Sequence, residues 1–146
     1  MRRIEKLCVI IHLFVGIGAL GGGAVPIINP SSPMGMSAEA LQNSPFTSFL
    51  IPGLLLFVVI GLGNLFAALS FFRQWELRPF ISGFFAFALV MWLAIQCAML
   101  QAVAALHVIF FCIGAAQGIL AICLMFMSYN TYERGFTEPA KYLNNR

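Results

Sequence analysis

The chain has 146 residues, of which 61% are hydrophobic and 9% charged, and its formal net charge is +3. A soluble domain has roughly 45–50% apolar and about 25% charged residues, so the composition excludes a surface covered by water and favours lipid as the solvent. The length fits a single domain. The basic residues do not cluster with aromatic residues on one face, so nucleic acid is not an expected partner.

Four apolar segments follow one another along the chain, at about 7–28, 49–72, 79–100 and 104–127. Each has close to the roughly 20 residues that a helix needs to cross a bilayer core of about 30 Å. None contains Asp, Glu, Lys or Arg, and backbone groups in lipid must be satisfied within the segment, which requires helices. We therefore predict an all-α integral membrane protein, an antiparallel bundle of four transmembrane helices in which residues 1–146 form one membrane domain.

The connection at 29–45 is rich in Pro, Ser and Asn, which favour turns, and is predicted to be the outer loop. Within it, Ser37 is suited to cap one short helical turn. Ser44 is expected to cap the second helix, with Pro45 at its first position. Pro52 falls inside the second apolar segment, where its missing N–H predicts a helix kink. The other two connections are short, which favours antiparallel neighbours.

The distribution of basic residues predicts the orientation in the membrane. In a chain with four spans, the N-terminus, the second connection and the tail at 128–146 lie on one side. All of the Lys and Arg residues fall on that side: Arg2, Arg3, Lys6, Arg73, Arg78, Arg134, Lys141 and Arg146. By the positive-inside rule, both termini are cytoplasmic. We expect a multi-pass protein of a bacterial inner (cytoplasmic) membrane, with its outer loop outside the cell.

The first segment has a second interpretation, as a cleaved signal peptide. "MRRIEK" resembles a positively charged n-region, and the apolar run after it ends in small residues. Cleavage would leave three spans and would break the one-sided charge pattern by moving one terminus outside. The charge pattern therefore favours a retained first helix.

The stretch "GIGALGGG", Gly16–Gly23, contains the letters G-x-G-x-x-G of a dinucleotide-binding turn. That turn needs a preceding strand and a βαβ unit, neither of which can form inside a charge-free membrane span, so no nucleotide is expected. Gly18 and Gly22 are four residues apart, as are Gly114 and Gly118 in the fourth segment. Such spacing lets membrane helices approach closely. We predict that the first and fourth helices pack at these glycines.

Motifs for catalysis or metal binding are missing from the sequence. It has no H-E-x-x-H, no phosphate-binding loop, no Cys/His metal spacing and no G-x-S-x-G. We therefore assign no catalytic residue, no cofactor and no metal site. The cysteines are expected to act as small hydrophobic residues, and whether Cys97 and Cys112 pair is left open. The four are Cys8, Cys97, Cys112 and Cys123.

Uncharged polar residues inside the spans form the candidate site. At about 1.5 Å per residue, His12, Asn64 and Gln117 lie roughly 12–15 Å from the inner ends of their helices, in one layer. Gln96 and His107 would form a second, outer layer. Such groups should point into the bundle and bond to one another. They form either a small polar site or hydrogen bonds that only hold the helices together.

The stretch "SPFTSFLIPGLLLFVVIGLGNLFAA", Ser44–Ala68, resembles small uncharacterised bacterial four-helix membrane proteins. The likeness extends to the glycine-rich first helix, the outer loop before S-P-F, and a W-x-x-x-Q element at Trp92–Gln96. It covers most of the chain apart from the tail. It implies a four-helix membrane fold and brings no function and no catalytic residues with it.

Two classes of function lead, both with the lipid bilayer as a partner. The first is a non-enzymatic protein that binds a ligand or lipid, or serves as an accessory subunit with a protein partner or in a homo-oligomer. The alternative is a small, oligomeric transporter or channel with His12, Asn64 and Gln117 lining its path. An intramembrane enzyme comes third. A water-accessible polar cavity at the inner layer would favour transport or binding, whereas a dry packed core would favour the accessory role.

Overall fold

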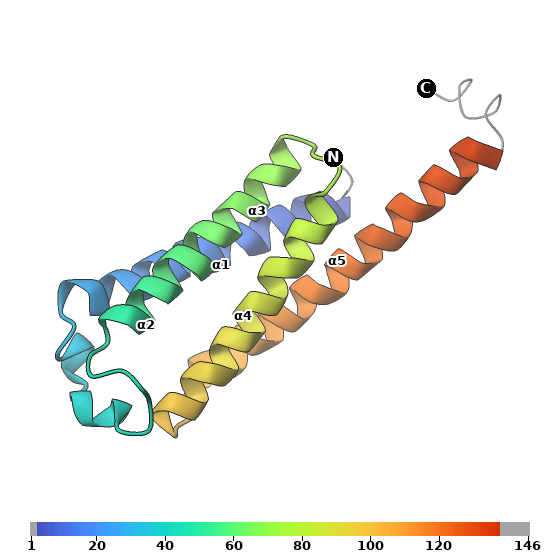
Figure 1. Cartoon of the computed structure of the whole chain (residues 1–146). Coiled ribbons are helices and arrows are strands. Elements are labelled where there is room, and N and C mark those ends of the chain that lie inside the picture. Colours follow the sequence, from blue (N-terminus) through green and yellow to red (C-terminus); the bar gives the residue numbers. More distant parts are fainter. Residues whose placement is uncertain (1–2, 138–146) are drawn as a thin grey trace.

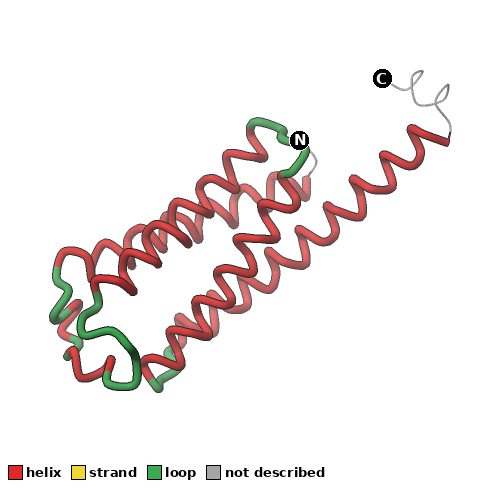
Figure 2. The backbone as a smooth tube through the Cα atoms, viewed as in Figure 1, coloured by secondary structure: helices red, strands yellow, loops and turns green. Residues whose placement is uncertain are grey.

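The computed structural model describes residues 3–137, and this part of the chain is helical without strands (Figure 1, Figure 2). Four helices are long and apolar enough to cross a membrane, which confirms the all-α prediction with four candidate spans and suggests a multi-pass membrane protein. They are α1 (Arg3–Ile28), the second span (Leu50–Phe72), α4 (Arg78–Leu100) and α5 (Ala105–Thr137). The second span comprises α2 (Leu50–Leu55), a π-helical segment (Leu56–Leu62) and α3 (Gly63–Phe72).

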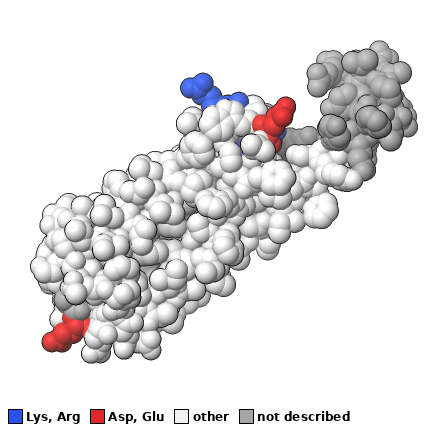
Figure 3. Space-filling view, viewed as in Figure 1, with Lys and Arg blue, Asp and Glu red and all other residues white. Residues whose placement is uncertain are grey.

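The bundle has two distinct ends and an apolar surface between them. We call the end that carries residues 29–49 and 101–104 the loop end, and the opposite end, where α1 begins, the terminal end (Figure 1). On the face shown in Figure 3, charged side chains lie at the two ends and none lies between them. Large apolar side chains such as Ile10, Phe14 and Ile17 are about 60% exposed, as a surface facing lipid requires.

Two predicted helix boundaries are wrong. Helix α1 begins at Arg3, one turn before the predicted 7, and α5 continues to Thr137, ten residues beyond the predicted 127. The sequence has no proline between Ala105 and Thr137, so the helical hydrogen bonds of α5 continue through polar residues that were expected to form a tail. The remainder of that predicted tail, 138–146, lies outside the described residues.

The entry into the second span also differs from the prediction, because the helix begins at Leu50 rather than after Ser44 and Pro45. The Ser44 hydroxyl instead donates to the Leu41 carbonyl and accepts from the Phe46 N–H, which closes a turn in the loop. Pro52 therefore falls in the first helical turn, where its missing N–H has no partner to lose, and the predicted kink at Pro52 is not needed. The departure from α-helical geometry is the π-helical segment four residues later.

The turn at residues 38–41 confirms the predicted cap. Ser37 Oγ accepts a hydrogen bond of 3.2 Å from the Glu39 N–H, and a short 3₁₀ helix follows at Ala38–Leu41. A second short turn, Pro33–Gly35, precedes it. These turns fold the connection over the loop end of the bundle (Figure 2).

Glycines bring α1 against the second span, and not against α5 as predicted. A Cβ at Gly23 would lie 2.7 Å from the Phe57 backbone nitrogen and 2.8 Å from the Gly53 carbonyl oxygen. A Cβ at Gly16 would lie 3.2 Å from the Gly61 carbonyl oxygen. The glycines in use are thus seven residues apart, two helical turns on one face, so the backbones touch at both places.

The predicted contact of Gly18 and Gly22 with Gly114 and Gly118 is wrong. Gly18 faces the ring of Phe110, and Gly22 faces a Leu56 methyl group. Gly114 packs against α4, and no neighbour lies within 4 Å of a Cβ built at Gly118. Helix α5 pairs with α4 in a hairpin (Figure 1), so the large ring of Phe110, rather than a glycine, fills the space towards α1.

The core consists of two apolar clusters with a polar layer between them. The cluster near the loop end is Val15, Ala19, Ile60, Leu89, Trp92, Leu93 and Met99. The cluster near the terminal end is Cys8, Val9, Ala68, Phe71 and Leu124. His12 falls between the two sets along α1, as does Asn64 along the second span. On α5, Gln117 lies between Leu124 and Ile113, a partly buried residue that packs against the loop-end cluster. The fold therefore places the polar side chains at one depth.

Candidate functional site

The structure brings the three predicted residues of the inner layer together and adds a fourth, Ser82. Their side chains come from all four spans: His12 from α1, Asn64 from α3, Ser82 from α4 and Gln117 from α5. Each is 0–1% exposed. We call these four residues the polar layer. Because every span contributes one member, hydrogen bonds within the layer tie the whole bundle together.

His12 is the centre of the polar layer. Its Nδ1 lies 2.8 Å from Asn64 Oδ1, and its Nε2 lies 2.8 Å from Ser82 Oγ. The tautomer with hydrogen on Nδ1 satisfies both contacts, because Nδ1–H then donates to the Asn64 oxygen while Nε2 accepts from the serine hydroxyl. Asn64 is itself held in place, since its Nδ2 donates to the Ile60 carbonyl in the π-helical segment at 2.8 Å.

Gln117 completes the polar layer from α5. Its Nε2 lies 2.9 Å from His12 Nδ1 and 3.1 Å from Asn64 Oδ1. With the hydrogen on Nδ1, the Gln117 amide donates to the same Asn64 oxygen and meets Nδ1 as a second donor. With the hydrogen on Nε2 instead, Nδ1 accepts from Gln117 and Nε2–H donates to Ser82 Oγ. Gln117 Oε1 is buried and has no hydrogen-bond partner among the described residues. The polar layer therefore contains one acceptor without a partner.

Ser82 was missed from the sequence because a serine in a membrane helix commonly bonds to its own backbone. Ser70 does so, as its hydroxyl donates to the Ala67 carbonyl at 2.6 Å. Ser82 instead reaches across to His12 on another helix. Both serines are 0% exposed, so burial alone does not separate the two roles. A buried histidine needs a hydrogen-bond partner on each ring nitrogen, and this need could have indicated a second partner for His12.

The order Ser82–His12–Asn64 is that of a nucleophile, its base and the group that orients the base. Both connecting distances, 2.8 Å, fall within the range for such a relay. A nucleophile must also be reached by its substrate, and Ser82 Oγ lies in a side chain that is 0% exposed. In this conformation the three residues therefore hold helices together and do not meet a substrate.

Glu5 and Arg78 form an ion pair at the terminal end that the sequence analysis did not anticipate. Arg78 Nη2 lies 2.8 Å from Glu5 Oε1, and the Glu5 side chain is 4% exposed. Glu5 shares the inward face of α1 with His12, seven residues later. It was overlooked because the predicted span began after it. The pair connects the start of α1 to the start of α4.

The predicted second polar layer does not form. His107 lies in the first turn of α5, where its Nδ1 accepts a hydrogen bond of 2.9 Å from the Ala104 N–H. It therefore caps the start of its own helix. Gln96 is half-buried on α4 and lines a cavity at the loop end. The four cysteines are free thiols, with Cys97 half-buried and Cys112 exposed, so no disulfide joins them here.

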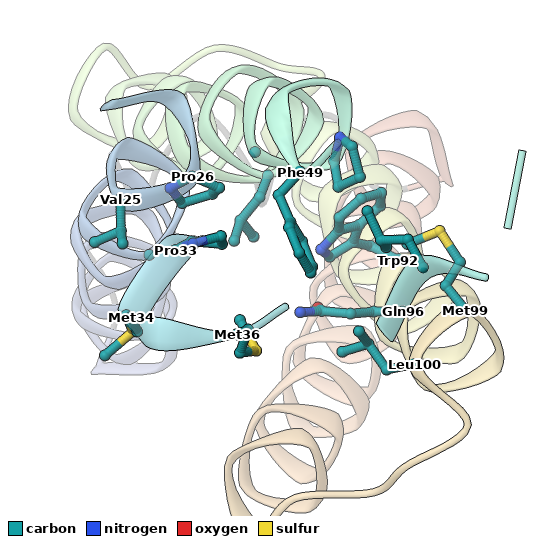
Figure 4. Close-up of a pocket in the computed structure, with 15 residues that line it drawn as sticks. Val25, Pro26, Pro33, Met34, Met36, Phe49, Trp92, Gln96, Met99 and Leu100 are labelled. Atoms are coloured by element: carbon teal, nitrogen blue, oxygen red, sulfur yellow. The ribbon is translucent and has the colours of Figure 1, made fainter. Parts of the chain in front are cut away.

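The cavity at the loop end has a volume of about 90 Å³. Its walls come from the last turns of α1, the 33–41 turns, the beginning of the second span and the last turns of α4. Trp92 and Gln96 lie one turn apart on α4, and Figure 4 shows the indole nitrogen and the amide facing the same space, across from Pro33 and Met36. We call this space the loop-end cavity.

Trp92 distinguishes the loop-end cavity from an ordinary packing defect. Its side chain is 7% exposed, and its Nε1 is a buried donor without a partner among the described residues. Eight residues separate Trp92 from the end of α4, which places it about 12 Å below that end, too deep for an interfacial anchor. A buried N–H without an acceptor costs about 1–3 kcal/mol, so the site is incomplete as it stands.

A second space in the structure is an apolar groove that also has Trp92 in its wall. It lies between the π-helical segment and α4, has a volume of about 350 Å³, and is lined by apolar residues that include Val59, Ala88 and Ile95. Trp92 and the neighbouring core residue Ile60 also line it. Val59 and Ile95 are 39% and 45% exposed, so the groove faces the region where lipid would lie. We call it the lateral groove.

Comparison with known proteins found no matching family model, no similar curated protein and no similar solved structure.

Proposed function

We propose that this chain is a non-enzymatic membrane protein that binds a small molecule or lipid segment in the loop-end cavity. In this proposal the loop end faces the outside of the cell and both termini are cytoplasmic, as the one-sided distribution of Lys and Arg indicates. The observation that carries it is Trp92 Nε1, a buried donor that faces a cavity and lacks an acceptor. A bound acceptor would remove that cost.

The polar layer has a different role in this proposal, which is to hold the four spans in register. Its members are 0–1% exposed, and their hydrogen bonds cross between helices. In membranes such bonds contribute on average about 0.6 kcal/mol each, up to about 1.7 kcal/mol. The bonds centred on His12 therefore supply a moderate, specific stabilisation that keeps the walls of the cavity in place.

The alternative function, an oligomeric transporter or channel, would use the polar layer as part of a path. It would require His12, Asn64 and Gln117 to meet water, and their near-complete burial gives a solute no route past them in this conformation. The loop-end cavity would then be one half of an alternating path. Binding without transport needs no such opening, and for that reason we favour it.

A serine hydrolase is the third candidate, because Ser82, His12 and Asn64 have the geometry of a catalytic relay. Its test is labelling by a fluorophosphonate probe in membranes, with Ser82→Ala as the control. The proposed binding function predicts no labelling at Ser82. Labelling that Ser82→Ala removes would instead make the protein an enzyme.

Access to the loop-end cavity can be measured through Trp92. The chain has two tryptophans, so Trp75→Phe leaves Trp92 as the only one. Acrylamide, a small neutral amide that quenches tryptophan on contact, would serve as the probe. We expect saturable quenching of Trp92 in reconstituted vesicles, because the cavity admits a molecule that carries a carbonyl acceptor.

Two substitutions by phenylalanine provide the comparison. Val25→Phe adds a ring in the cavity wall, whereas Val58→Phe adds the same ring on a surface that is 49% exposed. The proposal predicts that Val25→Phe removes the saturable quenching and that Val58→Phe leaves it unchanged. Quenching that is weak and linear in the parent, or equal in both variants, would contradict a ligand cavity at this place.

A further inference from the structure

Resting on the proposed function, we infer that the ligand is a neutral acyl lipid whose ester carbonyl binds at Trp92 and whose chain lies in the lateral groove. Trp92 lines both the loop-end cavity and the groove. In this inference a single molecule occupies both spaces, with Trp92 as the wall that they share. Its polar part would face the loop end, and its chain would lie between the π-helical segment and α4.

Hydrogen-bonding groups determine the chemistry at the polar part of the ligand. Trp92 Nε1–H is a donor only, and the amide of Gln96, one turn away on the same helix face, has two further N–H donors. Two donors aimed at one space are suited to an acceptor with two lone pairs, such as a carbonyl oxygen. The Gln96 oxygen remains available for a hydroxyl on the same ligand.

Charge then excludes the commonest membrane headgroups. No Lys, Arg, His, Asp or Glu lines the cavity or the groove. The charged residue in the connection at the loop end is Glu39, whose side chain is exposed. A phosphate or carboxylate brought to this end would find no cation and one anion. Burying an unpaired charge is far more costly than burying a hydrogen-bonded carbonyl, so the ligand is uncharged.

The lateral groove determines the apolar part of the ligand. It is apolar throughout its lining, and its exposed residues Val59 and Ile95 would face the bilayer. A chain can thus enter sideways from the membrane without passing through water. The contact area supplies affinity that a small cavity of about 90 Å³ does not give by itself. A monoacylglycerol has the required carbonyl, neutral head and single chain.

The experiment uses the Trp75→Phe protein and monoacylglycerols with a dibrominated chain, because bromine quenches tryptophan at close range. The ester is compared with the ether analogue, which has the same chain and head but no carbonyl. A neutral hydrogen bond is equivalent to a roughly three- to tenfold change in affinity. We expect the ester to quench Trp92 at a several-fold lower mole fraction than the ether.

Two variants separate the parts of the inference. Gln96→Leu removes one of the two donors and should reduce the preference for ester over ether, while Ala88→Phe, which fills the groove, should weaken both analogues at least threefold. Ala88→Leu serves as a second groove variant should the larger residue disturb folding, as judged by helical content and elution as a single species. Equal binding of ester and ether, or unchanged binding by both groove variants, would overturn the acyl-lipid assignment.

The outcome also distinguishes this inference from the function on which it rests. Saturable acrylamide quenching that Val25→Phe removes, together with no preference for the ester, would retain a ligand cavity and reject the acyl lipid. Absence of both signals would reject the cavity as a binding site. A stronger response to the dibrominated fatty acid anion than to the neutral ester would also overturn the inference, because it would require a cation that these walls do not contain.

Discussion

Two buried side-chain polar atoms lack hydrogen-bond partners among the described residues, and they lie in contrasting regions. Gln117 Oε1 belongs to the polar layer, where the other groups are bonded to one another and the side chains are 0–1% exposed. Trp92 Nε1 belongs to a side chain that lines the loop-end cavity, a space of about 90 Å³. The same kind of defect thus occurs once in a packed region and once beside a void.

The difference shows how to distinguish polar side chains that hold membrane helices together from polar side chains that form a binding site. An orphan atom in a packed layer has no room for a ligand, so its cost is tolerated because neighbouring bonds across the helices outweigh it. An orphan donor that faces a cavity can be satisfied by something from outside. The four-helix hydrogen bonding therefore marks the scaffold, and the cavity with the unsatisfied tryptophan marks the site.

The largest expected effect comes from breaking the close contact between α1 and the second span at Gly23. Gly23→Ala places a Cβ within 3 Å of backbone atoms of Phe57 and Gly53, which cannot move aside as a side chain would. We expect a loss of about 3 kcal/mol in unfolding free energy, measured by SDS titration in mixed micelles.

Gly21→Ala, two residues away, is the matched control. A Cβ there meets nothing within 4 Å, so the better helix propensity of alanine should leave stability unchanged or raise it by up to about 1 kcal/mol. Similar losses at Gly21 and Gly23 would show that α1 does not pack on the second span through this face.

The second effect is the removal of the centre of the polar layer. His12→Leu leaves the Ser82 hydroxyl without its partner on α1 and removes the His12 contact of the Asn64 oxygen, which keeps only Gln117. We expect a loss of about 2 kcal/mol in unfolding free energy. The triple variant His12→Leu, Asn64→Leu, Gln117→Leu should lose less than the sum of the three single changes, because it leaves fewer polar groups unsatisfied. A strictly additive triple variant would argue against a coupled network.

The smallest effect compares two buried serines. Ser82→Ala removes a hydrogen bond between α4 and α1 and should cost about 1 kcal/mol, whereas Ser70→Ala removes a bond within one helix and should cost less than about 0.5 kcal/mol. Both changes delete one hydroxyl from a fully buried position, so the difference isolates the interhelical bond. Equal losses would place Ser82 outside the layer.

Periodicity and composition predicted the spans and the common depth of His12, Asn64 and Gln117, because lipid forces helices and helical rise converts sequence position into depth. The same information could not predict which helix faces meet. The glycines of "GIGALGGG" illustrate this: the spacing Gly18–Gly22 was chosen, yet Gly16 and Gly23 make the close contacts. Both pairs satisfy helical spacing, and only the packing of the other helices decides between them.

The loop-end cavity could not be predicted at all, since its walls come from four separate parts of the chain. Trp92 and Gln96 were noticed as a W-x-x-x-Q element, and their spacing does place them on one helix face. What the sequence could not tell is that the turns at 33–41 fold back over that face and leave a space. Ser82 was missed for a related reason, because its partner lies on a different helix.

The central claim is that the loop-end cavity, and not the polar layer, is the site. Each region contains one glutamine that can be changed to leucine: Gln96 in the loop-end cavity and Gln117 in the polar layer. The measurement is quenching of Trp92 by the dibrominated monoacylglycerol in the Trp75→Phe background. We predict that Gln96→Leu weakens binding about fivefold with stability preserved, and that Gln117→Leu leaves binding unchanged while altering stability. Binding that is lost in Gln117→Leu but retained in Gln96→Leu would contradict the account.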